Sequence, residues 1–174
     1  MINRETIQSL GDLFKKGLQE ELIKQGHKDT GKLINSIEFD IEFDGKDYWL
    51  SFSYLFYGEI VRRGVKAENI PFSGRTGGKL KVSKYIQALM AYGQRKGVKD
   101  PKRFAFAVAF THKREGMPTK RSSRFSKTGR RKFFVEDAVN EVQPKAITLL
   151  TEKIGYLIEK NIIEQFIHYE FDVN

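Results

Sequence analysis

A glycine-rich stretch at residues 73–80 (SGRTGGKL) is the part of the sequence most similar to a catalytic motif. Loops of this kind cradle nucleotide phosphates when four residues separate the first glycine from a Gly-Lys pair followed by Ser or Thr. Here three residues separate Gly74 from Gly78, and Leu80 replaces the hydroxyl that would bind magnesium. The stretch is therefore predicted to be a loop that hydrolyses no nucleotide.

Alternating carboxylates offer a second possible chemistry, the binding of a hard cation. Glu38, Asp40 and Glu42 point to one face of a predicted strand, because successive side chains of a strand alternate. Neighbours on that face are roughly 7 Å apart, and the sequence shows no second set of oxygen ligands. We expect an acidic strand face that serves as an interface and holds no metal.

Histidine and cysteine usage indicates no metal centre or nucleophile. His27, His112 and His168 lack the paired spacing of metal ligands, and the chain has no Cys. No nucleophile, base and orienting residue can be assigned. The sequence predicts a protein that is not an enzyme and has no cofactor.

Charge is distributed very unevenly along the chain. Of its 31 Lys and Arg residues, 21 lie between Arg62 and Lys132, where only three of the 22 acids occur. A cationic middle between anionic flanks suits a polyanionic partner, or another copy of the chain with opposite faces apposed. We predict that a partner neutralises the bases of residues 113–132, which are Lys113, Arg114, Lys120, Arg121, Arg124, Lys127, Arg130, Arg131 and Lys132.

Length and composition indicate one folded domain spanning residues 1–174. Hydrophobic residues make up 40% of the 174, enough to bury a core at this size. No apolar leader is present, and no run approaches 18 apolar residues. We expect no membrane insertion, and synthesis and use in the cytoplasm.

The elements that would position these groups begin with an amphipathic helix of about six turns. Asn3 can cap its start and Gly26 can end it. Its apolar stripe consists of Ile7, Leu10, Phe14, Leu18 and Leu22.

A hairpin should follow this helix. Apolar and polar residues alternate over residues 36–43 and again over residues 50–54. Asp44 and Gly45 suit the two central positions of a type I′ turn. The helix is expected to cover the apolar face of this small antiparallel sheet.

The basic middle is predicted to contain two short helices. One is capped by Ser83 and ends near Gly97, and the other starts at Asp100-Pro101, carries Phe104 and Val108, and ends at Gly116. We expect a short helix before Gly64 and an exposed loop over residues 69–81. Residues 117–132 are predicted to be an extended basic loop that cannot order itself alone.

After this loop the chain should return to the core and end in a long helix. Phe133, Phe134, Val135 and Ala138 are expected to be core residues, and Pro144 is expected to open the helix. The whole is an α+β fold, with an N-terminal helix on a small antiparallel sheet, two short central helices and a long C-terminal helix.

Three short motifs, in this order, resemble the tail-completion or head-tail joining (neck) proteins of long-tailed bacteriophages. DTGKLINSI at residues 29–37 resembles Asp-Thr-Gly-x-Leu-x-x-Ser-Ile, and YGEIVRRG at residues 57–64 is similar to Tyr-Ala-x-x-Val-Glu-x-Gly. KFFVEDA at residues 132–138 resembles Arg-Pro-Phe-Leu-x-x-Ala. Arg62 and Phe133 depart from these patterns, and the region between the second and third motifs is enlarged.

The resemblance implies a non-enzymatic virion structural protein at the head-tail junction. It would be made in the host cytoplasm and would assemble as a ring, through which DNA passes, between connector-side and tail-side phage proteins. The residues leave two alternatives open. One is a nonspecific nucleic-acid-binding protein, and the other is a nuclease or other phosphoryl-transfer enzyme whose bases hold the substrate.

Overall fold

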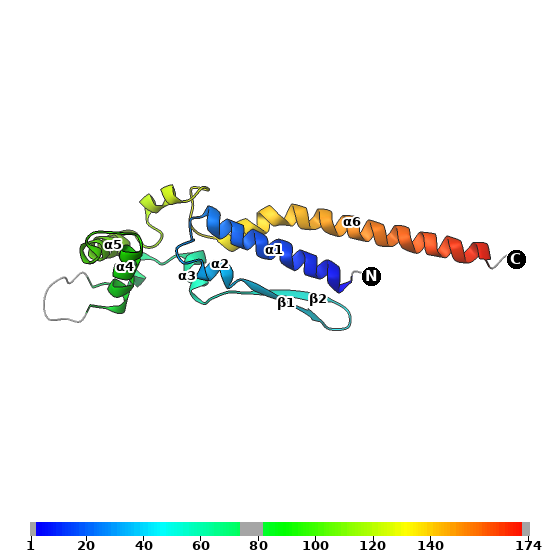
Figure 1. The fold of residues 1–174 in the computed structure, drawn as a ribbon, viewed down its shortest axis with the longest axis horizontal. Helices are drawn as coiled ribbons and strands as arrows, with labels where there is room; N and C mark the ends of the chain where they lie inside the picture. The colour runs from blue at the N-terminus through cyan, green and yellow to red at the C-terminus, as the bar shows by residue number, and fades with distance from the viewer. Residues whose placement is uncertain (1–2, 74–81, 172–174) are drawn as a thin grey trace. The chain divides into compact units, whose positions relative to one another are not determined.

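The computed structural model describes residues 3–73 and 82–171, with side chains described as far as residue 161. It confirms the α+β class, with a helix at each end of the chain and a two-stranded antiparallel sheet (Figure 1). Its contacts group into two compact units, Met1–Gly58 with Phe133–Asn174 (unit 1) and Glu59–Lys132 (unit 2). That both units fold together as one domain stays a prediction.

Helix α1, Arg4–Lys24, begins and ends where its sequence predicts. The side chain of Asn3 accepts a hydrogen bond from the Thr6 amide, which satisfies a free donor of the first turn. At the other end Gly26 has φ +78°, and the His27 amide donates back to the Leu22 carbonyl at 2.8 Å. This left-handed glycine stop redirects the chain out of the helix.

Helix α1 covers one face of the hairpin formed by strands β1, Glu38–Phe43, and β2, Tyr48–Ser53. On the covered face the Phe39 and Phe52 rings lie 5.8 Å apart. A Cβ at Gly11 of α1 would lie 2.3 Å from the Phe39 ring, so the helix and the strand approach closely at this glycine. A four-residue helix, α2 (Lys32–Asn35), precedes β1 and was not expected from the sequence.

The hairpin turn differs from the predicted one. A type I′ turn needs φ above zero at both central residues, but of Asp44 and Gly45 only the glycine has it, at +95°. Asp44 instead uses one carboxylate oxygen to accept from the amides of Lys46 and Asp47 at 2.9 and 2.7 Å. The turn is wider than predicted, with residues 44–47 between the paired Phe43 and Tyr48, and the Asp44 amide also donates to the Asp47 carbonyl at 3.3 Å.

The long C-terminal helix is confirmed as α6, Phe134–Phe171, but the prediction that Pro144 opens it is wrong. Phe134, Ala138 and Val142 are buried at steps of four, so burial holds the helix ahead of the proline. A Cβ at Gly17 of α1 would meet Val142 at 2.3 Å, which marks the close approach of α1 and α6. Packing therefore outweighs the single backbone hydrogen bond that Pro144 removes.

Unit 2 holds α3 (Tyr57–Arg63) from Glu59 on, η1 (Ala67–Asn69), α4 (Lys84–Arg95), α5 (Pro101–Glu115) and η2 (Lys120–Phe125). The predicted caps are confirmed, since the side chains of Ser83 and Asp100 accept from the amides of Ile86 and Arg103. Gly64, Gly97 and Gly116 have positive φ where their helices end, as expected.

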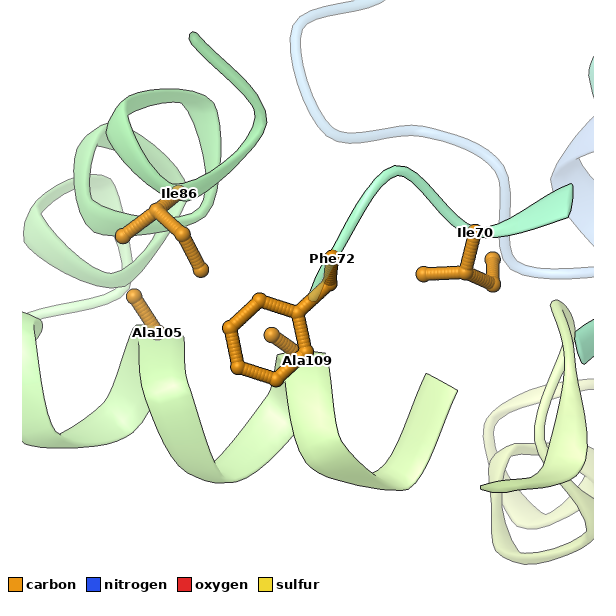
Figure 2. Close-up of a cluster of buried hydrophobic side chains, with 5 residues drawn as sticks. All are labelled: Ile70, Phe72, Ile86, Ala105 and Ala109. Atoms are coloured by element: carbon orange, nitrogen blue, oxygen red, sulfur yellow. The ribbon is translucent and has the colours of Figure 1, made fainter. Parts of the chain in front are cut away.

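The core of unit 2 contains two residues that were predicted to lie in an exposed loop. Ile70 and Phe72 are buried against Ile86 of α4 and against Ala105 and Ala109 of α5 (Figure 2). The small alanines, rather than the predicted Phe104 and Val108, are the fully buried positions of α5, because they leave room for the Phe72 ring. Most of the glycine-rich stretch at residues 73–80 lies outside the described residues.

Candidate polyanion-binding surface

The uneven charge of the sequence coincides with the division into units. Unit 2 carries 21 bases and four acids, whereas unit 1 carries 10 bases and 18 acids. Opposite charge therefore belongs to two separate packing units of one chain. The summed electrostatic field of unit 2 is therefore expected to be positive.

Residues 117–132, here called the basic arm, form a loop whose two ends meet the same short segment of unit 2. Met117 exchanges two backbone hydrogen bonds with Val65, at 2.7 and 2.8 Å. At the other end the Lys132 side chain lies over Gly64, where an added Cβ would be 2.6 Å from its Cε. Compact surface loops closed in this way are held by their own contacts and are frequently functional.

The basic arm is ordered by hydroxyl groups, which corrects the prediction that it cannot order itself. Within η2 the hydroxyls of Ser122 and Ser123 donate to the carbonyls of Thr119 and Lys120. Past η2 the Ser126 hydroxyl donates to the Arg130 carbonyl at 2.7 Å. Polar hydrogen bonds replace the buried apolar area that the segment lacks.

Glu115, the acid next to the basic arm, ties its first turn to α5. One carboxylate oxygen accepts from the Lys120 amide at 3.2 Å, and the other pairs with Arg114 at 2.8 Å. The hydrogen bond from Arg114, followed by that from the Lys120 amide, lowers the pKa of this carboxyl. The acid is thus a positioning group of the basic arm.

The nine bases predicted to meet a partner fall into two groups. Lys113 donates to the carbonyls of Glu68 and Ile70 at 3.3 and 3.5 Å, and Arg131 is half-buried, which lowers the pKa of its guanidinium. Arg114 is paired with Glu115, and the Lys132 side chain lies over Gly64. The side chains of these four bases therefore contact other parts of unit 2. The second group consists of Lys120, Arg121, Arg124, Lys127 and Arg130, which are all exposed. Lys113 and Arg114 are exposed as well, but their side chains make the contacts just described.

An exposed aromatic side chain accompanies these bases. Phe125 is 62% exposed at the end of η2, and the Arg124 guanidinium carbon lies 4.8 Å from its ring centroid. This cation–π contact holds the guanidinium over the ring while leaving its N–H donors available to a ligand.

The predicted acidic face is present on the side of the hairpin away from α1. Glu38, Asp40 and Glu42 are all exposed, and Glu42 stands opposite Trp49 on β2. Sequence reasoning missed Trp49, which is 62% exposed, although its outward position follows from the alternation of β2. This face is suited to a cationic partner.

A half-buried histidine, His112, joins α4 to α5 within unit 2. The Tyr85 hydroxyl lies 2.6 Å from Nδ1 of His112. Burial raises the pKa of Tyr85 and lowers that of His112, while the nearby Glu115 carboxylate partly opposes the second effect.

Unit 2 is expected to lose stability as the pH falls below about 6.5, the ordinary pKa of histidine. Because the His112 pKa is lower in the folded state, the unfolded chain binds the proton more readily, and stability falls towards the lowered pKa. Thermal unfolding measured between about pH 5 and pH 8 should show this slope, and His112→Gln should flatten it. An unchanged slope in the variant would contradict this role for His112.

Among residues 3–73 and 82–161, no three His, Cys, Asp or Glu side chains are grouped so that they could hold a metal ion. In the described part of the chain, no helix is long and apolar enough to cross a membrane. Compared with protein-family models, curated proteins and solved structures, the chain has no match.

Proposed function

We propose that this chain is a non-enzymatic structural protein of a bacteriophage virion, placed at the head-tail junction. It is made in the host cytoplasm and assembles as a ring between connector-side and tail-side proteins, with DNA passing through. The observation that carries the proposal is a stretch of α6 whose apolar side chains have no cover in the single chain.

Helix α6 buries only its first part. Its buried side chains end at Ala146, and in the described stretch from residue 147 to residue 161 none is buried. Ile147, Ile154 and Ile158, spaced along one face, are 40–55% exposed. A helical stretch of about 15 residues is marginally stable in water when nothing packs against it. The exposed apolar face of residues 147–161 therefore favours a protein whose α6 is packed against another chain in an assembly.

The positions of the three motifs also support the proposal. The first links α1 to β1, the second forms α3, and the third leads into α6. Each contains a residue with left-handed backbone, namely Gly31 at φ +72°, Gly64 at +74° and Phe133 at +62°. Each motif therefore contains a position whose backbone lies in the left-handed region.

The third motif departs from the family pattern in conformation as well as in sequence. Phe133 stands where the pattern has proline, and proline cannot adopt a positive φ. The approach to α6 thus departs from the family pattern. The expectation that Phe133 is a core residue is wrong, because its side chain is 44% exposed. The support from that motif rests on Phe134 and Ala138, which are both buried.

Immunogold electron microscopy of virions that carry this chain tests the proposal directly. Label is expected at the junction of head and tail. Its absence from purified particles, or label confined to the capsid shell or the tail tip, would overturn the proposal.

A substitution in α6 tests the observation behind the proposal. Ile154→Glu places a charge on the apolar face of α6 and is expected to lower incorporation into virions at least tenfold, because a carboxylate cannot be buried unpaired in an interface. The purified variant should keep its helix content, since Ile154 is exposed in the single chain. Thr148→Glu adds the same charge about 120° around the helix and should incorporate at the level of the unchanged protein. Equal incorporation of the two variants would contradict the role of this face.

A further inference from the structure

We propose that the basic arm binds the phosphate backbone of duplex DNA without reading its sequence. This binding function belongs to unit 2 and does not depend on the place of the chain in a virion. The carrying feature is the group of exposed bases on η2 and on the turn that follows it.

Charge balance favours a partner other than this chain. The acidic side of another copy cannot neutralise unit 2, because every copy brings the same net +9 and an assembly of copies alone keeps that excess. Duplex DNA carries one negative charge per ~1.7 Å of its axis, and binding it releases condensed counterions. A polyanion from outside the assembly is therefore the better match.

The geometry of η2 lines up two guanidinium groups. Side chains three residues apart in a 3-10 helix lie on one face, so Arg121 and Arg124 stand one turn apart, with about 6 Å of rise between them. Each guanidinium can bind a phosphate through two parallel N–H donors. Lys127, on the turn after η2, adds a third exposed cation.

The basic arm holds this arrangement before any ligand arrives. Its ends are closed on Gly64 and Val65, and its hydroxyls are engaged with its own carbonyls. Little conformational freedom is then lost on binding, which lowers the free-energy cost of association. In this respect the basic arm differs from a disordered charged tail, which loses conformational entropy when it becomes ordered on its partner.

Contacts of this kind place a duplex but do not select its bases. Guanidinium and ammonium groups bound to phosphate oxygens carry no sequence information. The exposed ring of Phe125 lies under Arg124 and can support that guanidinium against the backbone. Affinity should accordingly be similar for unrelated sequences and should depend steeply on salt.

Fluorescence anisotropy with a short random-sequence duplex tests the proposal on the full-length protein. Five exposed bases predict that log K falls with log salt with a slope of about −4 to −5 between about 50 and 300 mM NaCl. The triple variant Arg121→Ser, Arg124→Ser and Lys127→Ser should reduce the slope to about −2 and weaken binding at least about tenfold near 100 mM salt. Its thermal unfolding should stay close to that of the unchanged protein, because exposed charges contribute little to stability.

The matched control removes three exposed bases elsewhere in unit 2, by Lys66→Ser, Lys99→Ser and Lys102→Ser. It lowers net charge equally and should leave most of the slope intact. Equal losses in both variants would overturn the assignment to the basic arm, since general charge would then explain binding. No binding near 100 mM salt, or binding only to an acidic polypeptide such as polyglutamate, would overturn DNA as the ligand. Neither result changes where immunogold label appears on virions, so the two proposals fail separately.

Discussion

Phe134→Ala is expected to lower the free energy of unfolding of unit 1 by about 3–5 kcal/mol, the range for removing a large core ring. Phe134 is fully buried at the start of α6, and its ring lies 5.7 Å from that of Tyr54 in an edge arrangement. Alanine would leave a cavity at the place where the chain returns to α1 and the hairpin. Urea unfolding followed by far-ultraviolet circular dichroism measures the loss.

Two further variants show whether the effect comes from the buried ring. Phe134→Leu, which removes less volume, should fall between alanine and the unchanged protein. Ile147→Ala, on the same helix but 55% exposed, should change the stability of the isolated chain by less than about 1 kcal/mol. A loss below about 1 kcal/mol for Phe134→Ala would show that this ring is no part of a packed core.

Gly64→Ala should destabilise unit 2 by about 3 kcal/mol and release the basic arm. Gly64 has φ +74°, where a side chain costs roughly 1–2 kcal/mol. A Cβ there would also lie 2.3 Å from the Met117 carbonyl oxygen, a backbone atom that can move only if the closure of the basic arm opens. Limited trypsin digestion should then cut faster at Arg121 and Arg124, with the change in unfolding measured in parallel.

Gly129→Ala is the control for this substitution. Gly129 has nearly the same φ, +75°, but nothing lies within 4 Å of the position that a Cβ would take. It therefore carries the backbone strain without the clash and should cost about 1–2 kcal/mol. Equal effects at the two glycines would mean that contact with Met117 does not hold the basic arm closed.

Local signals in the sequence were sufficient for the helices of the basic middle and for α1. Ser83, Asp100 and Asn3 cap their helices, and glycines end them, because capping depends on hydrogen bonds within one turn of the chain. The alternation over residues 36–43 likewise predicted which side of β1 meets α1. These features depend on neighbours in sequence, which a pattern can show.

Errors arose where contacts distant in sequence decided the outcome. The sequence predicted that Ile70 and Phe72 lie in a polar, glycine-containing loop. In the structure they fill the space that Ala105 and Ala109 leave beside α4. Pro144 read as a helix start, yet buried side chains on both sides of it keep α6 continuous. In both cases burial outweighed the local preference.

The candidate site shows the same division. Counting charges identified residues 113–132, but it could not show that Lys113 would cap carbonyls of η1 and its neighbour while Arg121 and Arg124 stay exposed. A base serves the fold or stays free for a ligand according to what stands beside it in space. Packing between residues distant in sequence determines which groups lie beside each base.

By itself the sequence determined the composition of the chain, the separation of positive from negative charge and the helices and strands with their local caps. Only the tertiary structure decided that the positive charge forms a packing unit of its own and that residues 64 and 65 close the basic arm. The physical reason is that capping acts within one or two turns of chain, and charges can be counted along the sequence. Burial and loop closure join residues more than 50 positions apart, from Val65 to Met117.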